Sequence, residues 1–146
     1  MYDVIIVGAG PAGLTSAIYA GRSRLKTMVL EKSIVGGQLM LTENIENFPG
    51  FVGGISSQDL IDKMHKQAED FGAEFKNEEV KKITLESDFK QIHTSSNKYQ
   101  TKSIIIATGA HYKRLGVPGE DRLIGRGVSY CATCDGPLFK DKVVAV

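Results

Sequence analysis

The sequence has only two cysteines, almost no net charge and no apolar run long enough to cross a bilayer. Two cysteines are too few for the disulfide framework of a small secreted domain, and they suit a reducing compartment. The N-terminal residues lead straight into an apolar run with no basic leader before it. We therefore expect a cytoplasmic protein with no membrane partner.

The sequence also lacks an excess of either sign of charge. Eighteen lysines and arginines face seventeen aspartates and glutamates, which leaves a formal net charge of +1. Proteins that bind a polyanion concentrate basic residues, so nucleic acid is not an expected partner. Hydrophobic residues make up 42% of the 146 residues, which is enough for one ordinary globular core.

The first thirty residues predict a β-α-β unit with a right-handed crossover. Residues 4–7 are all β-branched and precede a glycine, as in a parallel strand that is buried on both faces. Pro11 suits the first turn of a helix, and an apolar stripe continues from it to about Ser23. Residues 27–30 form a second apolar run, which predicts the second strand.

The rest of the chain predicts a second helix and a small antiparallel β-meander. Residues 33–56 are rich in Gly, Asn, Ser and Pro, and we expect them to form a long functional loop. Apolar residues recur at helical spacing from Leu60 to Phe71, and Gly72 is placed to end that helix. Further strands are predicted at residues 80–86, 89–94, 99–103 and 104–107, the last one returning to the parallel sheet. The predicted fold class is therefore α/β, Rossmann-like, with a parallel sheet and an antiparallel meander.

Residues 8–13 read Gly-Ala-Gly-Pro-Ala-Gly, a G-x-G-x-x-G fingerprint between a predicted strand and a predicted helix. Gly8 permits the tight turn, Gly10 lets the backbone approach a pyrophosphate, and Gly13 lets helix and strand pack closely. The helix N-terminus adds free N–H groups and a positive dipole. Glu31 is placed to accept hydrogen bonds from an adenosine ribose. The alternative is a tight turn without a ligand, and the pattern alone does not distinguish FAD from NAD.

Residues 131–136 read Cys-Ala-Thr-Cys-Asp-Gly, a C-x-x-C followed by an acid. A structural zinc site would need two further ligands, and the three histidines of the chain are scattered singly, so no metal site is expected. Two inert thiols are another alternative. The acid at Asp135 favours a redox pair, Cys131 and Cys134, in which a carboxylate moves the proton.

Together these motifs resemble the low-molecular-weight thioredoxin reductases of bacteria. The most specific motif is residues 131–136 following Val117-Pro118-Gly119-Glu120. The resemblance also rests on the fingerprint and on three further segments: Gly36-Gly37-Gln38-Leu39, Glu46-Asn47-Phe48-Pro49-Gly50 and Ala107-Thr108-Gly109-Ala110. The resemblance implies an FAD-dependent enzyme that passes electrons from NADPH through FAD and the Cys131–Cys134 dithiol to oxidised thioredoxin, as a homodimer at full length.

The resemblance also implies roles for individual residues. Cys134 would lie next to the flavin, Cys131 would attack the thioredoxin disulfide, and Asp135 would be the acid-base group. The implied FAD-binding residues are Gly8, Gly10, Pro11, Ala12, Gly13, Glu31, Lys32, Gly36, Gly37, Gln38, Leu39, Asn47, Thr108 and Gly109.

The resemblance further implies the domain organisation. Residues 1–116 would be the N-terminal segment of an incomplete FAD-binding domain. Residues 117–146 would hold a linker, the C-x-x-C motif and a first strand, at 142–146, of a truncated NADPH-binding domain whose NADP site is absent from this chain. Two alternatives stay open: a flavin-binding fragment without turnover, and a related flavin-dithiol reductase or oxidase with another disulfide substrate.

Overall fold

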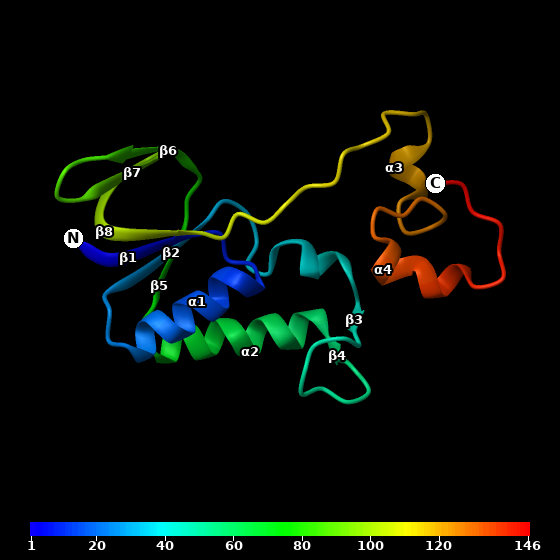
Figure 1. Ribbon diagram of the computed structural model, residues 1–146, viewed down its shortest axis with the longest axis horizontal. Helices are drawn as coiled ribbons and strands as arrows, with labels where there is room; N and C mark the ends of the chain where they lie inside the picture. Colours follow the sequence, from blue (N-terminus) through cyan, green and yellow to red (C-terminus); the bar gives the residue numbers. More distant parts are fainter. The chain divides into compact units, whose positions relative to one another are not determined.

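The computed structural model describes the backbone of residues 1–146 and all side chains except those of residues 133, 134, 137 and 138. The chain forms two compact units, Met1–Gly109 and Ala110–Val146 (Figure 1). Unit 1 holds the sheet and both long helices, and unit 2 holds short helical turns. The predicted domain boundary between residues 116 and 117 stays a prediction.

The predicted β-α-β unit is confirmed. Strand β1 (Tyr2–Val7) leads into helix α1 (Pro11–Arg22), and strand β2 (Thr27–Glu31) pairs with β1 in parallel. Strand β1 is buried on both faces because alternate side chains point to opposite sides of the sheet. Val4 and Ile6 belong to the core beneath α1, whereas the neighbouring Ile5 belongs to the core on the other face.

The sheet has six strands in the order β5-β2-β1-β8-β7-β6. The antiparallel meander is confirmed as β6 (Val80–Leu85), β7 (Lys90–Thr94) and β8 (Lys98–Ile106). The predicted strands at 99–103 and 104–107 are one continuous strand, β8. Residues 98–101 of β8 pair with β7, and residues 101–106 pair in parallel with β1. The sequence analysis missed the edge strand β5 (Glu74–Asn77), which pairs with β2.

Helix α2 (Ser57–Asp70) is the predicted second helix. Its N-terminus is capped by Ser56, whose hydroxyl accepts a hydrogen bond of 3.0 Å from the Asp59 N–H. Gly72 follows the helix with a φ of +86°, as expected for a left-handed ending. Helices α1 and α2 lie together on one side of the sheet (Figure 1). They approach closely at Gly21, where a Cβ atom would lie 2.6 Å from the Phe71 carbonyl oxygen.

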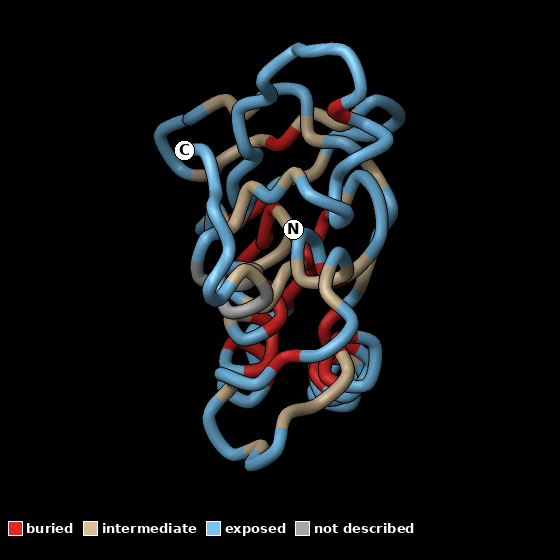
Figure 2. The backbone as a smooth tube through the Cα atoms, turned by 90° about the vertical axis from the view of Figure 1, so that its right-hand side faces the viewer, coloured by how far each residue is buried: buried red, intermediate tan, exposed pale blue. Residues whose placement is uncertain are grey.

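The predicted loop at 33–56 has more structure than expected. It contains a 3-10 helix, η1 (Gly37–Leu41), and a two-stranded sheet of β3 (Asn44–Ile45) and β4 (Ile55–Ser56). The loop is ordered by burial, because Ile45 joins Leu14 of α1 and three residues of α2 in an apolar cluster. Figure 2 shows the buried positions in red, gathered along the inner strands and helices.

Unit 2 has helix α3 (Glu120–Leu123), helix α4 (Ala132–Asp135) and the 3-10 helix η2 (Gly136–Phe139). The strand predicted at 142–146 is wrong: these residues form no strand, and Val143 and Val146 are fully exposed. An extended segment becomes a strand only when a neighbour takes up its backbone hydrogen bonds, and none of the observed strand pairings includes these residues. Within the part of the chain that the structure describes, no helix is both long and apolar enough to cross a membrane.

Candidate functional site

The fingerprint turn between β1 and α1 requires glycine at two positions. Gly8 has a φ of +106°, and a Cβ atom on it would lie 2.2 Å from the Ala107 carbonyl oxygen at the end of β8. Gly13 lies in the first turn of α1, where a Cβ atom would lie 1.9 Å from the Gly8 carbonyl oxygen. The turn is therefore packed against both the helix and the end of the neighbouring strand, as the fingerprint predicts.

Gly10 differs from these two glycines because the space beside it is open. The nearest atom to a Cβ on Gly10 would be the Gly36 carbonyl oxygen, at 4.0 Å. Gly10 is also the N-cap of α1, and no side chain caps this helix end. An uncapped helix N-terminus beside an open glycine backbone has the geometry that accepts a phosphate group. Pro11 and Ala12 form the first turn at this end of α1.

The structure brings the Gly36-Gly37 segment to the same place. The Gly36 N–H donates a hydrogen bond of 2.8 Å to the Ala9 carbonyl oxygen inside the fingerprint. A Cβ atom on Gly37 would lie 3.7 Å from the Gly10 Cα atom. Both glycines have positive φ, +111° and +59°. The two loops therefore approach each other through backbone atoms, and Gln38 and Leu39 follow in η1.

Glu31 makes two hydrogen bonds that the sequence analysis did not predict. Its carboxylate accepts two backbone hydrogen bonds, from the Ala9 N–H at 2.8 Å and from the Ser33 N–H at 3.0 Å. It thereby joins the fingerprint turn to the segment that follows β2. Carboxylate oxygens have further acceptor capacity, so the predicted contact to a ribose is compatible with this arrangement and stays a prediction.

Thr108 and Gly109 lie at the same edge of the sheet. The Ala107 N–H donates to the Val7 carbonyl oxygen at 2.8 Å, and a Cβ atom on Gly8 would lie 3.2 Å from the Thr108 Cα atom. Gly109 has a φ of +68°. Lys32 and Asn47, the remaining predicted cofactor residues, are exposed. Binding of a cofactor by each of these residues stays a prediction.

The dithiol segment lies in unit 2. Cys131 takes part in a disulfide, and the side chain of Cys134 is outside the described residues. Asp135 ends helix α4, and its N–H donates to the Cys131 carbonyl oxygen at 2.9 Å. The sequence analysis missed Ser129, whose hydroxyl contacts the Asp135 carboxylate at 2.6 Å and accepts from the Cys131 N–H at 3.1 Å. A serine two positions before the first cysteine is the only sequence signal for it, and that signal is weak.

Glu120 is a second residue that the sequence analysis did not place. It comes from the Val-Pro-Gly-Glu motif and is only 4% exposed. Its carboxylate accepts hydrogen bonds from the Gly116 N–H at 2.7 Å, the Leu115 N–H at 3.1 Å and the Arg114 guanidinium at 3.3 Å. Burial alone would raise the pKa of Glu120, but these hydrogen bonds outweigh it and hold the pKa below its ordinary value. The motif thus fixes the turn at residues 114–120.

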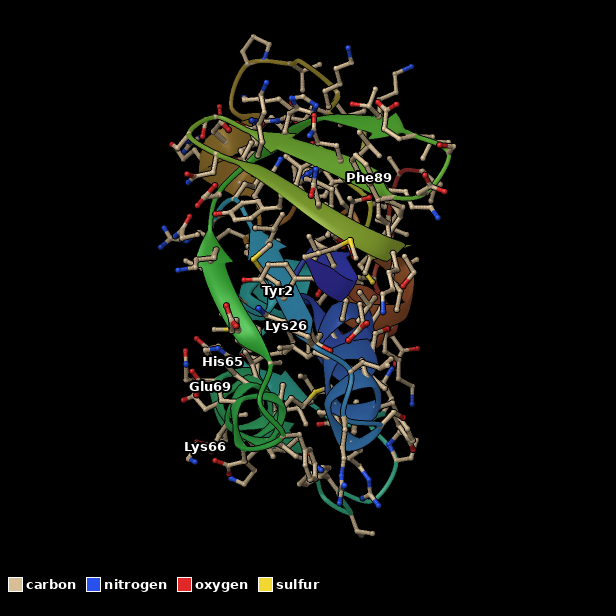
Figure 3. All side chains as sticks on the ribbon, turned by 90° about the vertical axis from the view of Figure 1, so that its left-hand side faces the viewer. Tyr2, Lys26, His65, Lys66, Glu69 and Phe89 are labelled. Carbon is tan, nitrogen blue, oxygen red and sulfur yellow. The ribbon has the colours of Figure 1, made fainter. Side chains whose placement is uncertain are left out.

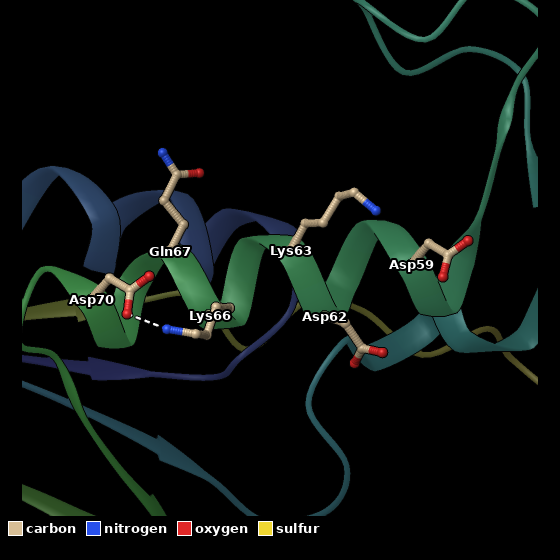
Figure 4. A pocket seen from close by; sticks show the side chains of 6 residues that line it. All are labelled: Asp59, Asp62, Lys63, Lys66, Gln67 and Asp70. Carbon is tan, nitrogen blue, oxygen red and sulfur yellow. Dashed lines mark hydrogen bonds and ion pairs between the residues drawn. The ribbon is translucent and has the colours of Figure 1, made fainter.

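Two other polar regions of unit 1 lie away from the fingerprint. At one end of the sheet the Tyr2 hydroxyl donates to Glu74 at 2.7 Å, and the Lys26 ammonium lies 4.9 Å from the centre of the Tyr2 ring (Figure 3). On the outer face of α2 a shallow hollow is lined by charged and amide side chains, and Lys66 pairs there with Asp70 (Figure 4). None of the predicted site residues lines this hollow, so we interpret it as a solvated helix face.

Comparison with known proteins identifies the family. The family model described as pyridine nucleotide-disulphide oxidoreductase matches residues 2–146. The chain belongs to this family. Among curated relatives of this chain, thioredoxin reductase from Bacillus subtilis (strain 168) is 48% identical over 146 residues, which is 100% of this chain and 46% of the relative.

Solved structures of thioredoxin reductases are also similar to this chain. Thioredoxin reductase from Streptococcus pyogenes MGAS5005 matches with a TM-score of 0.87 and 47% identity, over 95% of this chain and 45% of that chain. Thioredoxin reductase from Lactococcus lactis (FR conformation) matches with a TM-score of 0.79 and 47% identity, over 95% of this chain and 46% of that chain. The chain thus spans about half the length of these relatives. The predicted resemblance to thioredoxin reductases and the predicted α/β fold class are confirmed.

Among the described residues, no group of three or more His, Cys, Asp or Glu side chains is arranged to hold a metal ion. The interpretation of Cys131 and Cys134 as a redox pair stays a prediction.

Proposed function

We propose that the protein is an FAD-dependent oxidoreductase that passes electrons from NADPH through FAD and the Cys131–Cys134 dithiol to oxidised thioredoxin. The observation that carries the proposal is the presence, in one chain, of an open fingerprint turn and of a C-x-x-C motif whose Cys131 is in a disulfide, with 48% identity along the whole chain to a thioredoxin reductase. Because the chain spans about half of that relative, we propose turnover for a protein of the relatives' full length and expect this chain alone to be inactive.

The residues at the fingerprint fit an FAD. Gly10 and the uncapped end of α1 offer backbone N–H groups and open space for the pyrophosphate, and Glu31 stands at the end of β2 for the ribose. Gly36 and Gly37 approach Gly10 and would line the same side. The remaining residues proposed to line the FAD are Lys32, Gln38, Leu39, Asn47, Thr108 and Gly109. FAD supplies a two-electron carrier that accepts a hydride from a pyridine nucleotide and reduces a disulfide.

The dithiol residues perform the exchange with the protein substrate. The Cys131 thiolate attacks one sulfur of the thioredoxin disulfide, and the thiolate that leaves is protonated. Cys134 then attacks the Cys131 sulfur, which closes the Cys131–Cys134 disulfide and releases the second thioredoxin thiolate. Asp135 donates a proton to that thiolate and regains the one that Cys134 loses, while the proton that Cys131 lost on ionising returns through solvent to the first leaving thiolate. Two thiols of this protein have then become one disulfide, and one disulfide of the substrate has become two thiols.

The oligomeric state, the location and the electron donor of the protein are also part of the proposal. We expect a homodimer in the cytoplasm, with NADPH as electron donor. A flavin-binding chain without turnover is the second candidate. A third candidate is a flavin-dithiol enzyme that acts on another disulfide substrate.

A flavin assay separates these candidates. The purified chain should show bound flavin by absorbance, and Gly10→Val should lose it because a side chain would fill the open space at the fingerprint. Retained flavin in Gly10→Val would refute the assignment of this turn.

Turnover is measured on a protein of the relatives' full length that carries this chain. NADPH should then bleach the flavin anaerobically, and Cys131→Ser should keep the flavin but stop thioredoxin reduction. Thioredoxin reduction at an undiminished rate in Cys131→Ser would remove the dithiol from the reaction. Bleaching by NADPH without any reduction of thioredoxin would favour another disulfide substrate.

A further inference from the structure

Three residues of the dithiol segment form a closed set of hydrogen bonds. The Ser129 hydroxyl lies 2.6 Å from Asp135 Oδ2 and 3.4 Å from the Cys131 carbonyl oxygen. It also accepts the Cys131 N–H at 3.1 Å. The circuit closes through the Asp135 N–H, which donates to the Cys131 carbonyl oxygen at 2.9 Å.

The direction of the Ser129 hydrogen follows from these distances. A hydroxyl has one hydrogen and two lone pairs, and one lone pair already accepts the Cys131 N–H. Of the two acceptors within reach, Asp135 Oδ2 at 2.6 Å is at the distance of a strong O–H···O bond, whereas 3.4 Å to the Cys131 carbonyl is long. The hydroxyl therefore donates to Asp135 Oδ2, which can accept this hydrogen bond whether or not the other carboxyl oxygen carries a proton.

We propose that Ser129 is a positioning residue that holds the Asp135 carboxyl group in place for proton transfer to the dithiol. This inference rests on the proposed acid-base role of Asp135. Both Ser129 and Asp135 are accessible to water, so without a partner the Asp135 side chain would be free to change rotamer. Because the same hydroxyl also binds the backbone N–H of Cys131, it ties the position of the carboxyl group to that of the reacting cysteine.

The step that depends on this positioning is protonation of a leaving thiolate. When a thiolate attacks the disulfide of Cys131, one S–S bond forms and another breaks, and the sulfur that leaves carries the electron pair of the broken bond. Asp135 in its acid form gives that sulfur a proton and becomes a carboxylate. It regains a proton from the attacking thiol, so that the dithiol reagent is oxidised by two electrons and the protein disulfide is reduced to two thiols.

The test uses dithiothreitol as the reductant and this chain as it stands, so it does not depend on NADPH, flavin or thioredoxin. The rate at which dithiothreitol reduces the Cys131 disulfide is followed by alkylation of the released thiols. Ser129→Ala should slow this reduction about tenfold, a part of the effect expected for a general acid. Ser129→Thr keeps the hydroxyl and should restore most of the rate. Ser87→Ala is the matched control, because the Ser87 hydroxyl also donates to an aspartate, Asp88, but in unit 1.

A double-mutant cycle distinguishes positioning from a role in holding the turn. If Ser129 acts through Asp135, then Ser129→Ala should cost nothing further in an Asp135→Ala background. An equal loss in both backgrounds would mean that Ser129 supports the backbone turn at Cys131, and it would overturn the inference. A wild-type rate in Ser129→Ala would overturn it too.

The same cycle separates this inference from the proposed function. If Asp135→Ala alone leaves the reduction rate unchanged, then Asp135 is not the acid and both the positioning role and the proposed proton step fail. If Asp135→Ala slows reduction and Ser129→Ala does not, only the positioning role fails. Circular dichroism spectra equal to that of the wild type are required of each variant, and Ser129→Gly, which also lacks the hydroxyl, is the second variant if Ser129→Ala does not fold.

Discussion

A Cβ atom on Gly13 would lie 1.9 Å from the carbonyl oxygen of Gly8, so helix α1 and the end of strand β1 are closer than any side chain allows. At Gly10, three residues before Gly13 in the same fingerprint, the nearest atom to a Cβ atom would be 4.0 Å away. The two glycines of one motif therefore serve different purposes. Gly13 permits packing, and Gly10 leaves room for a ligand.

This difference predicts opposite results for two alanine variants. Gly13→Ala should lower the free energy of unfolding by about 2 kcal/mol, because backbone overlap outweighs the gain of about 1 kcal/mol in helix propensity. Gly10→Ala should change it by no more than about 0.5 kcal/mol and should weaken flavin binding instead. Denaturant titration and flavin absorbance measure the two effects. A stable Gly13→Ala, or a Gly10→Ala that unfolds, would contradict this division of roles.

Glu31 should matter for stability as well as for binding. Glu31→Ala removes the acceptor of the Ala9 and Ser33 N–H groups, and we expect a loss of about 1–3 kcal/mol, mainly because the partly buried Ala9 N–H loses its partner, whereas the exposed Ser33 N–H can bind water instead. Glu86, an exposed acid in the turn after β6, is the control, and Glu86→Ala should change stability by less than about 0.5 kcal/mol. If the two substitutions lowered the free energy of unfolding equally in a denaturant titration, the hydrogen bonds of the Glu31 carboxylate would not stabilise the fold.

Two tyrosines should make the fold sensitive to alkali. Burial, together with the hydrogen bonds to Glu74 and Glu78, raises the pKa of both Tyr2 and Tyr99 from 10.0 to about 12. Below pH 10 each phenol is neutral in the folded and the unfolded state. As the pH rises from 10 to 12 only the unfolded chain ionises, so stability falls across this window.

Denaturant titrations of the wild type, Tyr2→Phe and Tyr99→Phe across the same window check this prediction. Each variant should lose less stability with rising pH than the wild type does, because its phenol no longer titrates. Tyr19→Phe is the control, since Tyr19 is 69% exposed. If the wild-type and Tyr2→Phe curves ran parallel, Tyr2 would not contribute to the alkaline loss.

Glu120 should protect the amides of the turn at 114–120 from hydrogen exchange. A pKa held below its ordinary value means that the carboxylate contributes stability above that value, 4.5, and loses it as the pH falls through the folded-state pKa. Glu120→Gln should reduce the protection of the Leu115 and Gly116 amides already at neutral pH. Asp121→Asn is the matched control, because Asp121 also pairs with Arg114 but its side chain is 85% exposed. Unchanged protection in Glu120→Gln would contradict this role.

The sequence was sufficient to predict the strands and helices that local residue patterns determine. Strands β1 and β2 are short apolar runs, α1 and α2 have apolar stripes at helical spacing, and a φ of +86° at Gly72 follows from its place after α2. The glycine roles of the fingerprint also agree with the geometry, because the packing at Gly8 and Gly13 is a steric property of the motif itself.

The elements and site residues that the sequence analysis missed or predicted wrongly depend on tertiary contacts. Strand β5 has the sequence Glu-Phe-Lys-Asn with one half-buried residue, so it carries no strand pattern and exists because β2 offers it an edge. The converse holds at 142–146, where an apolar run without a paired neighbour forms no strand. Ser129 was missed for a related reason: its partner Asp135 is six positions away, and only the turn at Cys131 brings the two side chains together.

The pairing of β8 with β1 has a consequence for folding during translation. The Ser103 hydroxyl donates to the carbonyl oxygen of Asp3, 100 positions earlier, and residues 101–106 supply one whole side of the pairing of β1. During translation β1 leaves the ribosome long before this partner exists. The nascent chain therefore presents one unpaired edge of its most apolar strand until residue 106 emerges, and this interval is when a chaperone has most to protect.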